Sequence, residues 1–271
     1  MGLNHTLSLL KFLENPHKNL KIIHIAGTNG KGSTAATIYN ILISSGYKVG
    51  LYTSPHLINF NERIRVNGVT ITDEEIISFM KHIEPVINEI KSTFFEVTTA
   101  MAFYHFKDHD VDIAIIETGL GGRLDSTNIV NPSLTVMTPI SLDHMDILGD
   151  TIEKIAKEKA GIIKERVPLI TANQVNEVLK ILEKRTKKKS SVMHICPNPE
   201  SIQLNVDGTS FEVFGKNYTT SLIGYYQAQN AALAIAATKI INPKISSKSI
   251  DKGLRNVHWP GRLQLVSDNI Y

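Results

Sequence analysis

The segment with the most evident chemistry is a glycine-rich loop that follows an apolar run near the start of the chain. Residues 22–34 read IIHIAGTNGKGST. Glycines at this spacing let the backbone turn tightly and point successive N–H groups inward, while Lys31 can reach the terminal phosphates of a nucleotide. Ser33 or Thr34 can then lie beside a metal ion. The loop predicts a phosphate-binding site at the N-terminus of the following helix.

This loop departs from the common phosphate-loop pattern G-x-x-x-x-G-K-[ST]. Ile25 occupies the first glycine position, and Gly32 separates the lysine from the hydroxyl. A plain connection between a strand and a helix therefore remains an alternative for this segment. The loop alone does not name an enzyme.

Two further clusters of polar residues follow predicted strands. Glu117 ends the apolar run 111–117, and the segment SLDHMDILGDT, which contains Asp143 and His144, follows the run 134–138. Open α/β sheets build their sites at the carboxyl ends of strands, so we expect both clusters at one edge. Oxygen ligands suit magnesium, which favours a metal-binding role for Glu117. For His144, a metal ligand and an ordinary surface or core histidine are both open.

Other polar residues have a structural interpretation beside the functional one. Arg123 and Asp125 can contact a polar substrate or hold their own loop through an ion pair. By spacing alone, Lys159 is expected to face solvent like its neighbour Lys157. The hydroxyl of Ser54 would lie beside the phosphate loop if strands 21–26 and 49–53 are neighbours.

The elements that must position these residues alternate along the chain. Apolar runs at 21–26, 49–53, 111–117, 134–138 and 168–171 are separated by amphipathic segments. This alternation predicts an α/β fold with a mainly parallel sheet and helices on both faces.

Capping residues predict where several helices begin and end. We expect a helix at 33–45 that is closed by Gly46, and a helix at 73–91 that begins with the capping pair Thr72 and Glu75. Asp150 and Glu153 have the same spacing before a helix at 150–164, and further helices are expected at 227–241 and 247–257.

The segment 200–222 has short alternating runs around two glycine turns. It predicts antiparallel hairpins at one side of the parallel sheet. Residues 263–266 resemble a strand or linker that is just beginning. We therefore expect an ATP-binding domain at 1–262 and the start of a linker at 263–271.

Length and composition fit an ordinary globular protein. The 271 residues suffice for one large α/β domain or two small ones, and the formal charge of +3 does not indicate a nucleic-acid partner. The basic run 184–189 is interpreted as the solvated end of a helix. The single cysteine, Cys196, excludes an internal disulfide and is expected to be buried. No leader and no apolar run of membrane-spanning length are evident, so we expect a cytoplasmic protein without a membrane partner.

Taken together, these segments resemble folylpolyglutamate synthase and dihydrofolate synthase, ATP-dependent ligases of the Mur ligase superfamily. The resemblance covers essentially the whole chain. The motifs that carry it are GTNGKGS (27–33), SPHL (54–57), NERIRVNG (61–68), FFEVTTAMAF (94–103), ETGLGGRLDSTN (117–128), LDHMDILGDTIEKIAKEKAGIIK (142–164), YQAQNAA (226–232) and WPGR (259–262).

The resemblance implies roles for individual residues. The ATP-binding residues would be Gly27, Thr28, Asn29, Gly30, Lys31, Gly32, Ser33, Thr34, Asn230 and Arg262. Ser54 and Glu117 would bind one magnesium ion, and His144 would belong to a second. Lys31, His144 and a carbamylated Lys159 would act in catalysis. The pocket for the pterin substrate would be lined by Phe95, Glu96, Val97, Thr98, Leu124 and Asp125.

The implied reaction joins L-glutamate to dihydropteroate or to a reduced folate through an acyl phosphate made with ATP. Members of the family continue past the WPGR motif into a second domain, so this chain is expected to lack a partner domain that would be supplied separately. A non-catalytic nucleotide-binding fragment or a split subunit is the alternative. A Mur-type ligase acting on a cell-wall precursor is more distant, because GLGGRLDSTN and NERIRVNG are of the folate type.

Overall fold

A computed structural model of the chain describes residues 2–263. Within these residues one sheet contains eight strands, which are β1 (Ile22–Ala26), β2 (Val49–Tyr52), β3 (Ile64–Val66), β4 (Val69–Thr70), β5 (Ile113–Glu117), β6 (Leu134–Met137), β7 (Leu169–Thr171) and β8 (Met193–Ile195). Their order is β4-β3-β2-β5-β1-β6-β7-β8. From β2 to β8 neighbouring strands are parallel, whereas β3 and β4 are antiparallel additions at one edge. The predicted mainly parallel sheet is confirmed.

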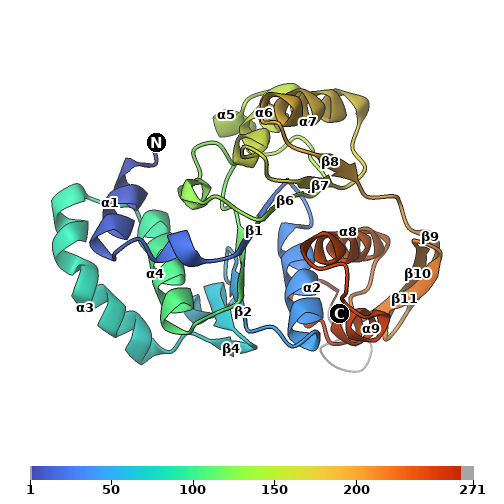
Figure 1. The fold of residues 1–271 in the computed structure, drawn as a ribbon, viewed down its shortest axis with the longest axis horizontal. Coiled ribbons are helices and arrows are strands. Elements are labelled where there is room, and N and C mark those ends of the chain that lie inside the picture. Colours follow the sequence, from blue (N-terminus) through green and yellow to red (C-terminus); the bar gives the residue numbers. More distant parts are fainter. Residues whose placement is uncertain (1, 264–271) are drawn as a thin grey trace.

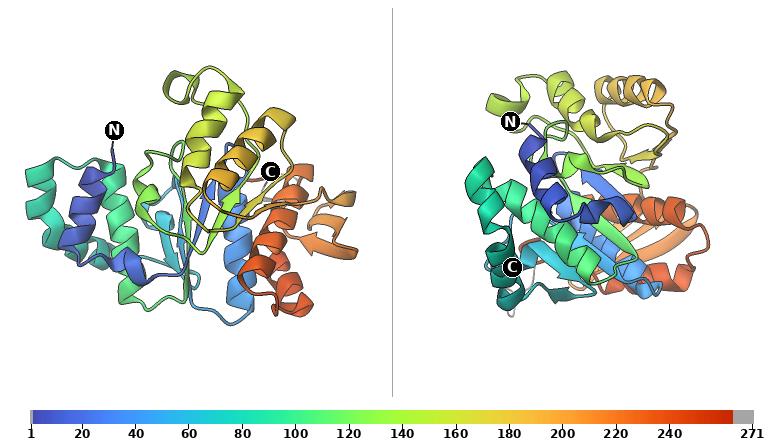
Figure 2. Two further views of the ribbon diagram at one scale, coloured as in Figure 1. Left: turned by 45° about the horizontal axis from the view of Figure 1, so that its top comes forward. Right: turned by 60° about the vertical axis from the view of Figure 1, so that its left-hand side comes forward.

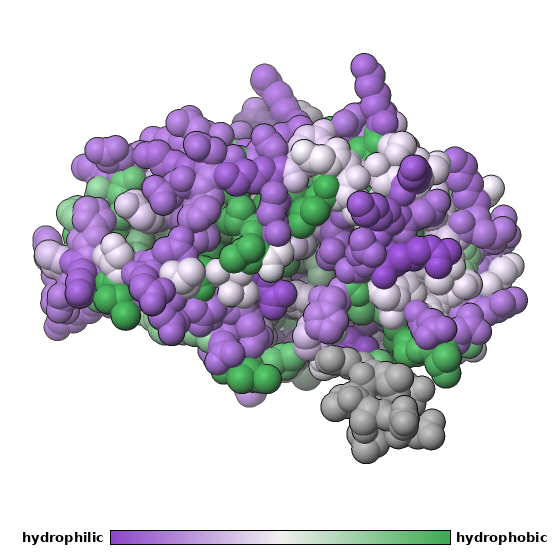
Figure 3. Space-filling view, turned by 90° about the horizontal axis from the view of Figure 1, so that it is seen from below, coloured by the Kyte–Doolittle hydropathy of each residue, from purple (hydrophilic) through white to green (hydrophobic). Residues whose placement is uncertain are grey.

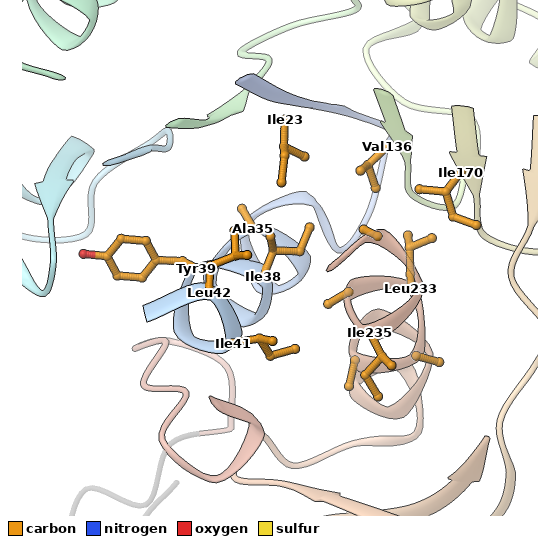
Figure 4. Close-up of a cluster of buried hydrophobic side chains, with 14 of the residues drawn as sticks. Ile23, Ala35, Ile38, Tyr39, Ile41, Leu42, Val136, Ile170, Leu233 and Ile235 are labelled. Atoms are coloured by element: carbon orange, nitrogen blue, oxygen red, sulfur yellow. The ribbon is translucent and has the colours of Figure 1, made fainter. Parts of the chain in front are cut away.

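One face of the sheet packs against α2 (Lys31–Ser44) and α8 (Tyr225–Ile241), with α9 (Ser247–Arg255) beside α2. Alternate residues of each strand point to this face. Ile23, Val136 and Ile170 descend from three neighbouring strands onto the two helices, as Figure 4 shows. Both helices are rich in small and aliphatic residues, so they lie close to each other and to the strands.

The opposite face carries two groups of helices (Figures 1 and 2). The helices α1 (Asn4–Phe12), α3 (Asp73–Ile90) and α4 (Phe94–Asp108) cover the β2 and β5 side, where they share a core with Tyr52 and Ile116. The helices α6 (Ile152–Lys159) and α7 (Asn176–Lys188) cover β6 and β7, with the short α5 (Met145–Leu148) before them. The predicted helices on both faces are therefore confirmed.

The hairpins predicted at 200–222 are present, but their predicted place is wrong. The strands β9 (Glu200–Asn205), β10 (Gly208–Val213) and β11 (Lys216–Thr220) form a separate antiparallel sheet outside α8 and α9 (Figure 1). Phe211 and Tyr218 are buried against α8, so the hairpin is held by its side chains and not by backbone pairing with β8. The antiparallel edge of the main sheet lies instead at β3 and β4.

Helix boundaries follow the capping chemistry with one correction. Thr72 and Glu75 form the predicted capping box of α3, and Gly46 has the expected positive φ, +89°, after α2. The N-cap of α6 is Thr151, whose side chain accepts from the N–H of Lys154, and not Asp150 as predicted. Asp150 pairs instead with the Lys154 ammonium at 2.8 Å. The helix ends at Lys159, earlier than expected, in a 3₁₀ turn over Ala160–Ile162.

The remaining features concern the surface, the apolar segments and the single cysteine. The face seen in Figure 3 is mainly hydrophilic, with hydrophobic residues in small separate groups. Among residues 2–263, no helix is both long and apolar enough to cross a membrane. Cys196 is buried as predicted, and burial raises the pKa of its thiol to about 12. The linker predicted at 263–271 lies, apart from Leu263, outside the described residues.

Candidate active site

Sheet order places the glycine-rich loop at the centre of the carboxyl edge. The strand β1 lies between β5 and β6, and the loop that leaves it contacts the segment after β6. The N–H groups of Thr28 and Asn29 donate to the Pro139 carbonyl, at 2.9 and 3.3 Å, and the Thr28 hydroxyl donates to the Ser141 carbonyl. These contacts fix the loop at the point where strand order reverses, which is where open α/β sheets bind ligands.

Two of the glycines have a structural requirement that other residues cannot meet. Gly30 has φ +82°, and a Cβ there would lie 2.2 Å from Asn230 Oδ1. A Cβ at Gly32 would lie 2.8 Å from Trp259 Cζ2, so this glycine lets the indole ring approach the loop. The extra glycine that breaks the common pattern is thus a packing position for the distant WPGR segment.

The loop holds its cation and hydroxyls in different surroundings. Lys31 is the first residue of α2, and its ammonium donates to the Thr28 carbonyl at 3.2 Å. Ser33 and Thr34 are buried behind it, and the Thr34 hydroxyl has no hydrogen-bond partner within residues 2–263. The loop therefore combines a positioned cation with the N–H groups of a helix N-terminus, which suits phosphate binding.

Glu117 is a buried carboxylate at the end of β5. It is 4% exposed, and its Oε2 accepts from the Ser54 N–H at 3.3 Å. Burial raises its pKa to about 7, although the nearby Lys31 ammonium and Arg262 guanidinium oppose this shift. No ion pair within 4.0 Å holds this carboxylate in the described part of the chain. A hard cation bound to Glu117 and the Ser54 hydroxyl would stabilise the ionised form, so these donors fit magnesium.

The phosphate loop and this carboxylate share one cleft. The strand β5 separates β1 from β2, so the condition under which Ser54 was expected beside the loop, that these two strands are neighbours, is not met. All three strands nevertheless end at the same edge, and this brings Ser54 to the loop. The cleft is lined by Gly32, Thr53, Ser54, Pro55, Leu57, Glu62, Arg65, Glu117, Trp259, Pro260 and Arg262.

Lys159 is buried, which corrects the expectation that it faces solvent. It is 3% exposed, and its ammonium donates to the Gly27 carbonyl at 2.7 Å. Burial lowers its pKa to about 8, and the charge of Lys31 acts in the same direction. Lys157 is exposed as expected. The difference arises because the end of α6 packs against the 119–128 loop, where the Arg123 N–H donates to the Glu158 carbonyl at 2.8 Å.

His144 lies at the surface and, unlike Lys159, is not buried by packing against another segment. Its backbone is left-handed, its side chain is 56% exposed, and its Nε2 is 3.6 Å from Asp143 Oδ2. Among residues 2–263, the only group of three or more His, Cys, Asp or Glu side chains with metal-ligand spacing contains neither His144 nor Glu117. The metal-binding role of His144 stays a prediction.

The 119–128 loop is held by its own polar residues. Asp125 accepts from the N–H groups of Leu120 and Thr127, at 2.9 and 3.0 Å, and burial raises its pKa. Arg123 Nε donates to Glu158 Oε1 at 3.0 Å. Of the two roles that the sequence left open for Arg123 and Asp125, these contacts show the structural one, which is to hold the loop. Leu124, between them, is partly exposed.

Of the residues predicted to line the substrate pocket at 95–98, Phe95 is the one placed against this loop. A Cβ at Gly119 would lie 2.5 Å from Phe95 Cζ. Glu96 accepts from the Thr93 N–H at 2.7 Å as part of a capping box. Val97 and Thr98 are buried. The four substrate roles remain predictions.

The remaining nucleotide residues come from distant segments. Asn230 is buried on α8, where its Nδ2 donates to Gln227 Oε1 at 3.1 Å and its Oδ1 faces Gly30. Arg262 lies in the cleft with Glu117. Both residues therefore lie beside the phosphate loop, and their roles in nucleotide binding stay predictions.

Sequence reasoning missed two residues of the cleft and one buried histidine that contacts the 119–128 loop. Arg65 and Trp259 face each other across the cleft, with Arg65 Cζ 5.9 Å from the indole centroid. His24 is fully buried, and its Nε2 is 2.8 Å from Thr127 Oγ1. Burial lowers the His24 pKa to about 3. A polar residue inside the apolar run IIHIA was the available signal for His24, since such a residue needs a buried partner.

Known proteins share this chain's sequence and fold. The Mur ligase middle domain model matches residues 25–238. The dihydrofolate synthase/folylpolyglutamate synthase of Bacillus subtilis is 44% identical over 99% of the chain, which covers 67% of that protein. The solved complex of folylpolyglutamate synthase (FPGS) with AMPPCP superposes with a TM-score of 0.94 at 35% identity, covering 98% of this chain and 71% of that one. The FPGS–AMPPCP–folate complex gives 0.92 at 35% identity, over 97% and 69%.

Proposed function

The chain belongs to the Mur ligase family, in its dihydrofolate synthase/folylpolyglutamate synthase group, and we propose that it uses ATP to add L-glutamate to dihydropteroate or a reduced folate. It spans about two thirds of the length of the curated relatives that it matches. We therefore propose the complete reaction for this chain acting together with the remaining third that those relatives contain. The observation that carries the proposal is the cleft that Gly32 of the phosphate loop lines together with Glu117 and Ser54.

In the proposed reaction a carboxylate oxygen of the pterin substrate attacks the γ-phosphorus of ATP, and ADP leaves. The acyl phosphate then reacts with the amino group of glutamate. The new C–N bond forms as the C–O bond to phosphate breaks, and the amine loses a proton. The products are an amide, ADP and inorganic phosphate. Relatives bind an ATP analogue and folate together, which supports this choice of substrates.

The residues of this chain would bind and orient the reactants. The N–H groups of the loop and the Lys31 ammonium would hold the β- and γ-phosphates, while Glu117 and Ser54 would hold magnesium. The ion, when bound, supplies electrostatic stabilisation of charge on the transferred phosphoryl group. Leu124 of the 119–128 loop and Phe95, which packs on that loop, would contact the pterin substrate. Positioning of the two reactants supplies much of the remaining rate enhancement.

We also propose that Lys159 is carbamylated and joins His144 at a second magnesium ion. The lowered pKa, about 8, leaves more of the neutral amine that attacks CO₂ than an exposed lysine has at neutral pH. The product is a carbamate anion and a proton, which turns a buried cation into an oxygen ligand. After incubation with ¹³C-labelled bicarbonate, a carbamate signal is expected in the parent chain and not in the Lys159→Arg variant. An equal signal in both would contradict the proposal.

The proposed location is the cytoplasm. A buried, unpaired thiol at Cys196 is stable in a reducing compartment, and ATP and folate substrates are available there.

The proposal is tested by nucleotide binding and turnover. Calorimetry on the 271-residue chain should show one Mg²⁺-dependent AMPPCP site. Lys31→Ala should weaken it by about 10- to 100-fold, because hydrogen bonds to charged groups contribute roughly 1.5–3 kcal/mol each. Lys157→Ala, which removes an exposed lysine, is the matched control. A chimera with the remaining third of the Bacillus subtilis relative should sustain ADP release over many turnovers only when glutamate and a pterin substrate are both present.

The two measurements separate the possible failures. Binding without turnover, even in the chimera, would favour the non-catalytic alternative. Unchanged AMPPCP affinity in Lys31→Ala would contradict the assigned phosphate site.

A further inference from the structure

A second cluster of metal-binding side chains lies outside the site described above. Glu75 is in the first turn of α3, and His105 and His109 lie one helical turn apart at the end of α4. One ligand atom from each lies within 4.8 Å of the others. Because α4 ends just before β5 begins, this cluster is at the amino end of the strands, opposite the edge that carries the phosphate loop.

The hydrogen bonds of the cluster fix which atoms are free. His109 Nδ1 is 3.0 Å from the His105 carbonyl, which can only accept, so this nitrogen carries the hydrogen. In the neutral ring, Nε2 then has a free lone pair, and it lies 3.4 Å from Glu75 Oε1. Glu75 Oε2 is held separately by the N–H of Thr72 at 2.7 Å. A ring nitrogen that donates to a backbone carbonyl while the other faces a ligand site is the usual arrangement of metal-binding histidines.

The His105 side chain also lies close to Glu75 Oε1. Its Nδ1 is 3.7 Å from Glu75 Oε1, too far for a hydrogen bond, and the side chain is 7% exposed. Burial, followed by the neighbouring His109, lowers its pKa to about 4, so the ring is neutral at physiological pH. Two ring nitrogens and one carboxylate oxygen therefore lie within 4.8 Å of one another, an arrangement that a shared proton or a cation between them would stabilise.

Two of the three ligand separations in this cluster are close to those of a zinc site. Tetrahedral Zn²⁺ with ligand bonds of about 2.0–2.1 Å separates its ligand atoms by about 3.3–3.4 Å. The two distances to Glu75 Oε1, 3.4 and 3.7 Å, are close to this value. Two histidines and one glutamate are a known three-ligand set for zinc. The Glu75 and His109 side chains are 36% and 34% exposed, so a water molecule can reach a fourth position.

We propose that Glu75, His105 and His109 form a zinc-binding site that ties α3 to α4. The first turn of α4 contains Phe95, which packs on the 119–128 loop, so the site would stabilise the helix that supports the substrate side of the cleft. The competing account is an ion pair between a protonated His109 and Glu75 without any metal.

The test is zinc binding by the tag-free chain with excess Mg²⁺ present to occupy the active site. Calorimetry and metal analysis should give one Zn²⁺ per chain, and Co²⁺ should give the visible absorption of a four-coordinate site. His109→Ala and Glu75→Gln should each weaken binding more than about 100-fold, which exceeds the loss of an outer-shell partner. His82→Ala, an exposed histidine on α3, is the matched control and should bind normally.

Two results would overturn the site. One is the absence of stoichiometric Zn²⁺ binding by the folded chain, which would leave the ion pair as the explanation. The other is equal Zn²⁺ affinity in His109→Ala, Glu75→Gln and His82→Ala, which would show that the metal binds elsewhere.

Discussion

At the scale of single residues, burial shifts the pKa values of the proposed catalytic groups. Glu117 and Lys159 are both buried, and each is held in a less charged form than it would have in water. Such shifts cluster at functional sites, because a buried charge there awaits a ligand that compensates it. We therefore interpret Glu117 and Lys159 as groups whose buried charges bound Mg²⁺ and nucleotide would compensate.

This interpretation predicts how stability depends on pH through Glu117. The pKa of Glu117 in the folded state, about 7, lies above its ordinary value of 4.5. As pH rises above about 4.5, the unfolded state loses this proton first, so the free energy of unfolding falls. The fall is complete above about pH 7. Glu117→Gln should therefore gain stability relative to the parent chain across this interval, by up to about 3 kcal/mol. Urea unfolding without Mg²⁺ at pH 5 and pH 8 measures the difference. A difference that does not change with pH would contradict the buried, unpaired carboxylate.

At the scale of elements, the glycines of the phosphate loop join α2 to α8 and to the WPGR segment. Sequence periodicity predicted most strands and helices of this framework, because their apolar faces are complete in the local pattern. It misplaced the 200–222 hairpins and missed β3 and β4. The strands β3 and β4 have only three and two residues, too few for an evident pattern. The position of the 200–222 hairpins is decided by their packing on the distant α8, which no local pattern contains.

The role of Gly30 can be separated from the general strain of a left-handed residue. Gly30→Ala and Gly46→Ala both place alanine at positive φ, which costs about 1–2 kcal/mol. Only Gly30→Ala also forces a Cβ against Asn230, and such overpacking adds about 1–3 kcal/mol. Thermal or urea unfolding should show the larger loss in Gly30→Ala, and calorimetry should show lost AMPPCP binding in that variant alone. Equal effects in both variants would argue against the contact with α8.

At the scale of the whole molecule, the active-site residues come from segments spread over most of the chain. The motifs and their resemblance to folate ligases predicted the phosphate loop, Ser54 and Glu117 as one site, and the structure places them in one cleft. Lys159 shows the limit of spacing alone, because only the packing of α6 on the 119–128 loop buries it. Arg65 and Trp259 were missed as a pair because they meet only after the chain has folded.

The central claim is that this cleft activates the carboxylate of the pterin substrate by converting it to an acyl phosphate. The most direct measurement uses dihydropteroate or tetrahydrofolate labelled with ¹⁸O in the reacting carboxylate, with Mg²⁺-ATP, glutamate and the chimera described above. The account predicts that each amide formed releases one phosphate carrying one ¹⁸O atom from the carboxylate, and that Lys31→Ala abolishes both products. Amide formation with unlabelled phosphate, or ADP release that does not depend on the pterin substrate, would contradict it.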